Sequence, residues 1–483
     1  ARPSLRPKLQ KQRGSGSFLK FWLVSLGGVA APPHGERCHH GVVNATTEHA
    51  PVDAWGPDFL GPGFEARTLE LLPDDEDDGA VATLVRHLPA LDPGALPGTP
   101  TTPTFIYLYL HGWNDYFFQT HLAREISRLG GAFYALDLRR YGRSWREGQM
   151  LGWCTSLAEY DEDLGLALSA IRADQGWETE VVLSGHSTGG LVASLWADRH
   201  PGAAQGLVLN APWLEYHGST MARQIGAPVV DMLARLSPAS VIPSGDGDFY
   251  QRAITAWRPP AAGDGDPDSA DASAAATARA TGAAANGPDP QARGEDSDDP
   301  FWTTGWNPDP AFRTGTGAPV RAGWLSAILA GHARVSGGLA IDCPVLVLTS
   351  ARSITGETWT EGFRAADSVL DVAQIWKRVP DLGAHTTLVK LEDAVHDVTL
   401  SRRDVRERAF GEIARFVRAY VLGRNGSETA RRFDGVGAPR RDGAREAIDG
   451  AWKRETARNG DGVSALRRVD RAADGEIGGG RSG

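Results

Sequence analysis

The sequence predicts an α/β fold in which a mostly parallel central sheet is covered by helices on both faces. Continuous apolar runs of strand length recur along the chain, and amphipathic stretches of helix length, such as 157–173 and 402–421, alternate with them. Strands that are buried on both faces and joined by helices are typical of parallel sheets. Ligands of such sheets bind at the carboxyl ends of the strands, so candidate catalytic residues should directly follow strands.

The expected strands lie in two patterned blocks, residues 52–260 and 301–422. The first two, at 64–72 and 80–88, flank an acidic turn and predict an antiparallel pair. Later strands, which should form the parallel part of the sheet, are expected at 104–110, 132–138, 180–183, 206–209, 343–348 and 386–391.

The 483 residues could form two or three domains, or one enlarged domain. Residues 261–300 contain no Leu, Ile, Val, Met, Phe, Tyr or Trp, and they hold nine acidic residues against two arginines. A segment with nothing to bury cannot offset its ordering entropy, so we expect a disordered acidic insertion there. We expect one domain over 52–422, with weakly ordered segments at 1–51 and 423–483.

The overall charge and the apolar runs exclude several classes of protein. A net charge of −10 at pH 7 gives no field that would attract nucleic acid. The longest apolar run, at about 21–31, is shorter than the ~20 residues of a membrane-spanning helix. We expect a cytoplasmic protein, or an exported one if residues 1–31 form a signal peptide. The three cysteines lack metal-ligand spacing, and we expect neither a metal nor a cofactor.

A serine at the end of an apolar strand is the strongest catalytic signal. Residues 181–190 read VVLSGHSTGG, a strand followed by the pattern G-x-S-x-G, and a helical pattern begins at Leu191. The flanking glycines allow a sharp strand-to-helix turn that exposes the serine side chain above the sheet. We therefore expect Ser187 to be a nucleophile.

A serine hydroxyl needs a base that takes its proton, and in this architecture the acid and then the base follow the serine. Three histidines lie downstream. His385 precedes the strand at 386–391 and belongs at the wrong end of the sheet, whereas His332 lies in a helical pattern. His396 follows that strand in a loop that can bring it over Ser187, and we expect it to be the base.

The acid that orients this histidine should follow the strand at 343–348, but a long loop intervenes before residue 367. Asp367 is the best placed candidate. Asp371 is its rival, although a carboxylate at a helix start has an alternative role on the helix dipole. Glu357 and Glu361 in the loop are further alternatives.

Two backbone N–H groups should stabilise the oxyanion that forms during acyl transfer. One is the N–H of Thr188, directly after the nucleophile. The other should come from the loop after the strand at 104–110, where His111, Gly112 and Trp113 follow one another. The N–H of Trp113 is the candidate, because Gly112 allows the backbone to come close.

These motifs resemble the α/β-hydrolases of the monoglyceride lipase, lysophospholipase and serine aminopeptidase (S33-like) group. The resemblance spans both patterned blocks and implies the α/β-hydrolase fold with a helical cap at about 214–335, into which the acidic insertion enters. The family usually places its acid a few residues after the strand, whereas here an extension over 349–366 intervenes. The residues that carry the resemblance are His111-Gly112-Trp113, the segment DLRRYGRS at 137–144, the segment GHSTGG at 185–190, Asp367-Ser368-Val369 and His396.

We therefore expect a serine hydrolase that cleaves carboxylic esters through an acyl-enzyme on Ser187. The resemblance implies a monoacylglycerol or lysophospholipid substrate, and a small ester is the alternative. It also implies that the cap, with Trp257, Trp302, Trp306 and Trp324, covers the site and lines an acyl pocket. Other possibilities are an amidase or aminopeptidase on the same fold and a non-catalytic binding protein, and the oligomeric state is left open.

Overall fold

The computed structural model describes residues 50–74, 79–216, 220–242, 248–258, 298–313 and 318–425, and the side chains of 220–227, 424 and 425 are not described. These residues contain a nine-stranded sheet in the order β1-β2-β3-β5-β4-β6-β7-β8-β9. Strands β1 to β3 are antiparallel to their neighbours, and all pairs from β5 to β9 are parallel. The strands are β1 (Gly56–Pro57), β2 (Phe64–Glu70), β3 (Val81–His87), β4 (Phe105–Leu110), β5 (Gly131–Asp137), β6 (Val181–His186), β7 (Gly206–Asn210), β8 (Val345–Ser350) and β9 (Thr386–Leu391).

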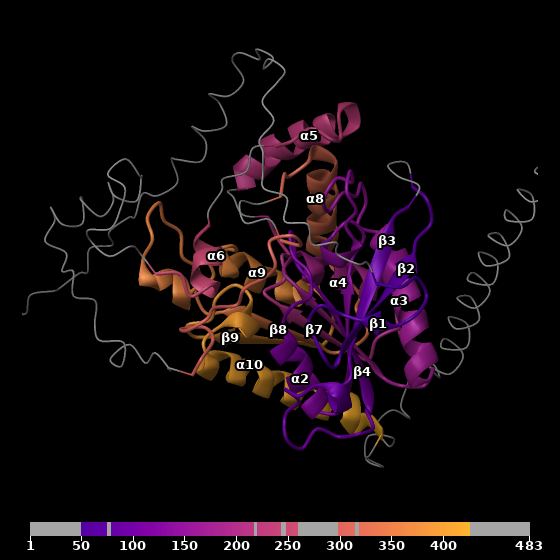
Figure 1. Cartoon of the computed structure of the whole chain (residues 1–483). Helices are drawn as coiled ribbons and strands as arrows, with labels where there is room; N and C mark the ends of the chain where they lie inside the picture. The colour runs from indigo at the N-terminus through magenta and orange to yellow at the C-terminus, as the bar shows by residue number, and fades with distance from the viewer. Residues whose placement is uncertain are drawn as a thin grey trace, which may run out of the picture.

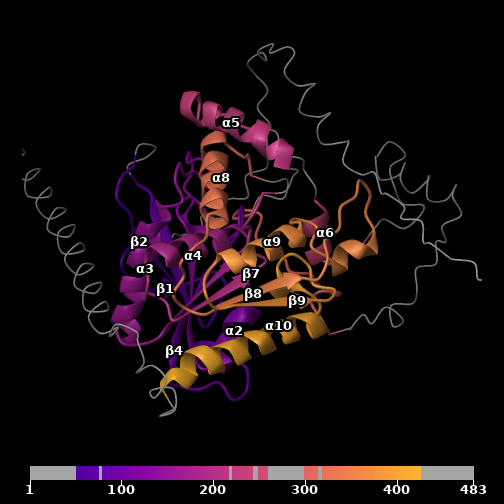
Figure 2. The same ribbon diagram turned by 180° about the vertical axis from the view of Figure 1, so that it is seen from behind.

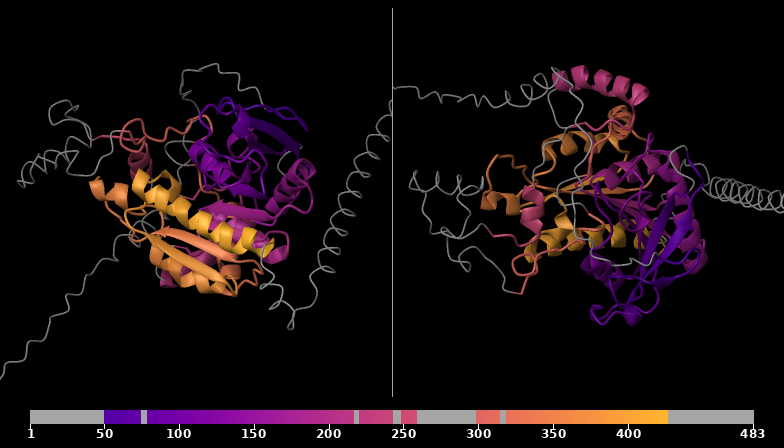
Figure 3. Two further views of the ribbon diagram at one scale, coloured as in Figure 1. Left: turned by 90° about the horizontal axis from the view of Figure 1, so that it is seen from below. Right: turned by 45° about the horizontal axis from the view of Figure 1, so that its top comes forward.

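Helices cover both faces of this sheet, as the sequence predicts (Figure 1, Figure 2). Helices α2 and α10 lie on one face, and Figure 3 shows α10 crossing the strands when the molecule is seen from below. Helices α3, α4 and α9 lie on the other face. The helices of the two layers are α2 (Thr120–Arg128), α3 (Tyr160–Gln175), α4 (Thr188–Arg199), α9 (Val372–Arg378) and α10 (Arg403–Phe416).

The central strand β4 shows why the apolar runs are continuous. All six of its residues are buried. Ile106 and Leu108 pack into the cluster that contains α3 and α4, whereas Tyr107 and Tyr109 pack into the cluster that contains α2 and α10. Because successive side chains of a strand point to opposite faces, a strand covered on both faces has no polar side.

Among the described residues, three helices inserted between β7 and β8 form a cap over the ends of the strands, namely α5 (Thr220–Leu236), α6 (Phe249–Ile254) and α8 (Ala322–Ser336) (Figure 1). The indole rings of Trp113, which follows β4, and Trp324 of α8 have centroids 3.7 Å apart. The cap therefore contacts the carboxyl ends of the strands, where an α/β sheet binds ligands.

Several expected boundaries differ from the structure, and three of these differences have a clear physical reason. Strand β6 continues through His186, because Gly185 and His186 still pair with β7, so that Ser187 directly follows it. Strand β8 begins at Val345, after Pro344, which lacks the N–H that a central strand needs. The acidic insertion does not extend to residue 300, because Asp299 is fully buried and accepts hydrogen bonds from the Arg403 N–H (2.6 Å) and the Arg406 guanidinium (2.7 Å).

The remaining residues of the predicted insertion up to 297, the predicted signal peptide, and residues 1–49 and 426–483 lie outside the described part of the chain. Within that part, no helix combines the length and apolarity needed to cross a bilayer.

Candidate active site

Ser187 lies at a strained turn between β6 and α4. Its backbone has φ +52° and ψ −117°, a region that non-glycine residues seldom adopt and that costs about 1–3 kcal/mol. The turn is held by a hydrogen bond of 3.0 Å from the Ser187 N–H to the Asn210 carbonyl. It also needs a glycine at position 189, because a Cβ there would overlap the His111 carbonyl. We call this sharp strand-to-helix turn the elbow, and its shape is the one that the sequence predicts around Ser187.

The loop after β4 lies directly against this turn. A Cβ built on Gly112 would be 3.1 Å from the Ser187 Cβ, so a glycine allows the two backbones to approach closely. Thr188 is the first residue of α4, where helix N–H groups lack intrahelical acceptors. Within the described residues, neither the Trp113 N–H nor the Thr188 N–H donates a hydrogen bond. Both groups that the sequence predicts as oxyanion donors are therefore available to a ligand.

His111 positions this loop. Its Nδ1 lies 2.7 Å from the Gly112 carbonyl, to which it donates, and its Nε2 accepts the Leu138 N–H at 3.1 Å. Burial lowers the pKa of the imidazole, which favours the neutral form that this donor-acceptor pattern requires. His111 thus ties the loop after β4 to the end of β5.

The structure brings Asp367 and His396 together. His396 Nδ1 lies 2.8 Å from Asp367 Oδ2, and both side chains are buried. The second oxygen, Oδ1, accepts the N–H groups of Val369 (2.8 Å) and Leu370 (2.7 Å). Burial alone would raise the pKa of Asp367, but His396 and these N–H groups more than offset it and hold the pKa below its ordinary value. The carboxylate is therefore ionised and can orient the imidazole.

The extension between β8 and Asp367 closes on itself. Ser353 and Asp367 form an isolated parallel bridge, the Ile354 N–H donates to the Asp367 carbonyl (2.8 Å), and the Asp367 N–H donates to the Arg352 carbonyl (3.0 Å). Residues 355–366 form a loop that begins and ends at this bridge. Asp367 consequently lies close to the end of β8. The α/β-hydrolases that this sequence resembles usually carry their acid at this place.

The rival acids have other contacts. Asp371 is the N-cap of α9 and accepts the Ala373 N–H at 3.0 Å, as its position at a helix start suggests. Glu361 pairs with Arg364 at 3.1 Å, and Glu357 is exposed.

The rival histidines are likewise held elsewhere. His332 of α8 contacts the Trp213 carbonyl at 2.9 Å, and His385 packs beside Tyr420 at the opposite end of β9.

The side chain of His396 packs against His186, the residue that directly precedes Ser187. The rings of His186 and His396 have centroids 4.9 Å apart, and the His396 ring also lies 5.6 Å from that of Tyr250 of α6, with the two planes at 85°. Burial lowers the pKa of His186, which keeps this neighbour of His396 neutral. Within the described residues, Ser187 Oγ makes no hydrogen bond with His396, and the ring contact that joins the two segments is the one between His186 and His396.

Asn210 and Asp397 join the elbow to the histidine loop, and the sequence analysis did not find them. The Asn210 side chain donates to Asp397 Oδ1 (2.6 Å) and accepts the Val398 N–H (3.1 Å), while its carbonyl accepts the Ser187 N–H. Gln119 adds a bond of 3.2 Å to Asp397. The one signal in the sequence is that Asn210 ends a strand on the catalytic side of the sheet.

A buried ion pair lies next to the loop after β4. Asp115 Oδ1 is 3.7 Å from a guanidinium nitrogen of Arg313, which comes from the cap. Burial raises the pKa of Asp115 to about 6, although Arg313 acts in the opposite direction. The Arg313 guanidinium also lies 5.5 Å from the ring centroid of Tyr250. The Asp115–Arg313 pair therefore connects the loop after β4 to the part of the cap that contacts His396.

Of the four cap tryptophans that were expected to line an acyl pocket, Trp324 alone lies against the predicted oxyanion loop. Trp306 packs on His121 of α2 and donates to the Leu400 carbonyl at 2.6 Å. Trp257 packs against Trp359 at 5.3 Å, and Trp302 packs against Phe301. These contacts support the packing of the cap, and the expectation that the three rings line an acyl pocket stays a prediction.

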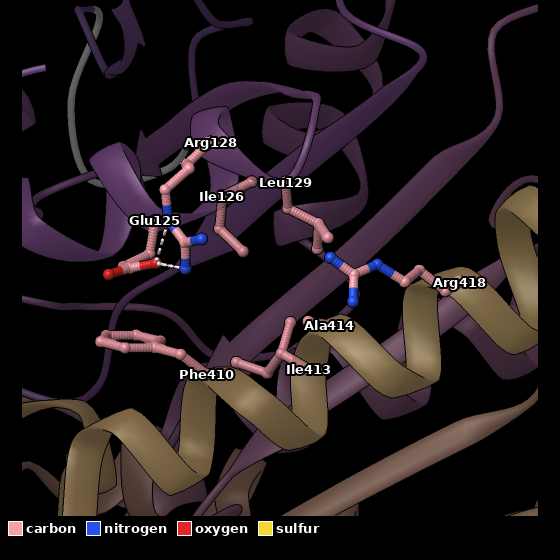
Figure 4. A pocket seen from close by; sticks show the side chains of 8 residues that line it. All are labelled: Glu125, Ile126, Arg128, Leu129, Phe410, Ile413, Ala414 and Arg418. Atoms are coloured by element: carbon pink, nitrogen blue, oxygen red, sulfur yellow. Dashed lines mark hydrogen bonds and ion pairs between the residues drawn. The ribbon is translucent and has the colours of Figure 1, made fainter. Parts of the chain in front are cut away.

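A shallow hollow between α2 and α10 is remote from these residues. Figure 4 shows an apolar floor that includes Ile126 and Ile413, with the Glu125–Arg128 ion pair at one rim and Arg418 at the other. It lies on the opposite face of the sheet from α4 and contains none of the predicted site residues.

The sheet order, the elbow after β6 and the helical cap inserted after β7 define the α/β-hydrolase fold. Residues 102–264 match the family model described as serine aminopeptidase, S33, so this part of the chain resembles that group of α/β-hydrolases.

Individual relatives are more distant. The monoacylglycerol lipase of Mycolicibacterium smegmatis is 28% identical over 156 residues, which are 32% of this chain and 54% of that protein. The chain thus spans about half the length of this curated relative. Among solved structures, a soluble variant of monoglyceride lipase from Saccharomyces cerevisiae is 16% identical, with a TM-score of 0.44 over 73% of this chain and 96% of that one. The monoacylglycerol lipase of Paleococcus ferrophilus is 16% identical, with a TM-score of 0.41 over 66% and 96%.

Proposed function

We propose that this protein is a serine hydrolase that cleaves carboxylic esters through an acyl-enzyme on Ser187. The observation that carries the proposal is the strained, positive-φ backbone of Ser187 at a strand-to-helix turn. Strain of this kind persists where the surrounding structure enforces it, and it aims the hydroxyl at the space above the sheet. The ionised Asp367 paired with His396 supplies the other two groups of a triad.

The roles follow from the geometry. His396 Nε2 takes the proton from Ser187 Oγ as the oxygen attacks the ester carbonyl, and it returns the proton to the departing alcohol. The N–H groups of Trp113 and Thr188 receive the charge that develops on the carbonyl oxygen, each worth about 3–4 kcal/mol. Water activated by the same histidine then releases the acid. The serine–histidine hydrogen bond forms when substrate is bound, as is common where the free enzyme has it long or misaligned.

An ester substrate is favoured over an amine-bearing peptide. An aminopeptidase needs an unpaired acidic group for the substrate ammonium. Among the described residues, the carboxylate nearest in sequence to the oxyanion loop is Asp115, and it already faces Arg313. A monoacylglycerol substrate is supported by the name of the Mycolicibacterium smegmatis relative, and lysophospholipids and small esters are the further candidates within the same chemistry.

The test is covalent labelling with a fluorophosphonate probe, together with hydrolysis of p-nitrophenyl esters of increasing chain length. Wild type should be labelled and should turn over the esters, and Ser187→Ala should lose both activities. Ser194→Ala removes another buried serine hydroxyl, from the helix that Ser187 precedes, and should leave labelling intact. Labelling that survives in Ser187→Ala would overturn the mechanism, and an unlabelled wild type would favour a non-catalytic binding protein.

A further inference from the structure

The extension before Asp367 makes a second set of contacts, with the cap. Because the bridge between Ser353 and Asp367 closes its base, residues 355–366 are not needed to bring Asp367 to the end of β8. We call these residues the arm. Its far part contains a short 3₁₀ helix, Glu361–Ala365, that packs against α6 of the cap.

Aromatic rings form the first part of this contact. Phe363 of the arm is 2% exposed, and its ring centroid lies 4.5 Å from that of Phe249 at the start of α6. Trp359 contacts Phe249 at 6.3 Å and Trp257 at 5.3 Å. Aromatic pairs at these separations stabilise the elements that they join. The arm therefore holds both ends of α6.

Arg364 forms the second part. Its guanidinium donates to the carbonyls of Ala253, at 2.9 Å, and of Trp257, and its side chain is almost completely buried. These carbonyls lie in and just after the last turn of α6, where no further helical N–H can reach them. A helix of six residues is not stable by itself, so α6 depends on such contacts.

Helix α6 in turn carries the side chain that packs against the predicted base. The ring of Tyr250 lies 5.6 Å from that of His396, with the two planes at 85°, and the Tyr250 side chain is half-buried. Edge-to-face packing of this kind restricts the rotation of an imidazole, and a displacement of about 1 Å at a reacting group can lower a rate 100-fold.

We propose that Arg364 is a positioning residue that holds α6 in place, so that Tyr250 keeps His396 in its reactive orientation. This inference rests on the proposed hydrolase function. It also gives the extension a role: the arm couples the loop that carries the acid to the part of the cap that covers the base.

A double-mutant cycle on the full chain tests this proposal, with kcat and KM for a p-nitrophenyl ester as the readout. Arg364→Ala should lower kcat by about tenfold with a smaller change in KM, and so should Tyr250→Ala. If Arg364 acts through Tyr250, adding Arg364→Ala to Tyr250→Ala should lower kcat by less than about twofold. A residue that merely stabilises the fold would instead show additive effects.

Two further variants keep the test decisive. Arg364→Lys retains the charge but reaches one carbonyl in place of two, and it should give an intermediate loss if Arg364→Ala does not fold. Glu361→Gln alters the half-exposed partner of Arg364 and should leave kcat within about twofold. Additive losses in the cycle, or full kcat in Arg364→Lys and Arg364→Ala, would overturn the proposal. Failure of the hydrolase function would be distinct, because wild type would then remain unlabelled by the fluorophosphonate.

Discussion

Replacing Asp367 with Asn tests its proposed role as the acid of the triad, because the two carboxylate oxygens have different partners. Asp367 Oδ1 accepts two buried N–H groups, those of Val369 and Leu370, and Oδ2 faces His396 Nδ1. In Asp367→Asn the amide oxygen must take the Oδ1 position. The opposite orientation would turn an NH2 group toward both N–H donors and leave each unsatisfied, at about 1–3 kcal/mol apiece.

The amide NH2 group therefore faces His396 Nδ1 and donates to it. The imidazole must then carry its proton on Nε2, where the base needs a lone pair to accept the proton of Ser187. The same replacement in a serine protease triad lowers kcat about 10⁴-fold, which is ~5 kcal/mol of transition-state stabilisation. We expect a loss of this size here, with KM little changed.

The assay is steady-state hydrolysis of a p-nitrophenyl ester, with the rate of fluorophosphonate labelling as an independent measure. Asp371→Asn is the matched control, because this acid caps α9 and an amide oxygen can still accept the Ala373 N–H. Its rate should stay within about twofold, with at most ~1 kcal/mol lost in stability. A rate above one tenth of wild type in folded Asp367→Asn, or an equal loss in Asp371→Asn, would refute the reasoning.

Three further predictions concern stability and pH. Ser187→Gly should be inactive, yet its free energy of unfolding should exceed that of Ser187→Ala by about 1 kcal/mol in urea titrations, because glycine relieves the strain at φ +52°; equal stabilities would argue against stored strain. Asn210→Leu leaves the Val398 N–H without its acceptor and frees Asp397 Oδ1 from one donor, so we expect a loss of about 2–4 kcal/mol in thermal unfolding and at least tenfold in kcat; an unchanged kcat would contradict the bracing role. Asp115 has a folded pKa of about 6 against an ordinary 3.8, so the folded state binds more protons between these values and this carboxyl lowers stability as the pH rises from 4 to 7. Asp115→Asn should therefore gain up to about 3 kcal/mol relative to wild type over that window, measured as the difference between their pH-stability curves, and parallel curves would contradict the raised pKa.

Much of the fold is visible in the sequence because it follows from local rules. The apolar runs predict strands because helices cover both faces of the sheet. Strand β4 illustrates this, since all six of its residues are buried. Ser187 could be predicted because the turn that exposes it needs small residues at fixed neighbouring positions. His396 could be predicted because the carboxyl ends of parallel strands meet at one edge, which excludes His385 and, with the helical pattern, His332.

The acid could not be selected by the same rules. Asp367, Asp371 and the two loop glutamates are all compatible with a long loop after β8. The choice depends on the bridge between Ser353 and Asp367, which closes the loop, and no local pattern specifies such a bridge. The role of the cap tryptophans could not be predicted for a related reason: an aromatic side chain in a helical layer has the same sequence pattern whether it faces a substrate or a supporting element.

The chain by itself thus determined the layers of the sheet, the strand-to-helix turn at Ser187, and the strand ends at which its proposed partners should lie, because periodicity and turn chemistry depend on residues close in sequence. Tertiary structure decided which carboxylate meets His396, that Asn210 braces a loop 187 residues away at Asp397, and that the arm supports α6. These contacts join segments that are distant along the chain, and their geometry is set by how the loops pack after the sheet has formed.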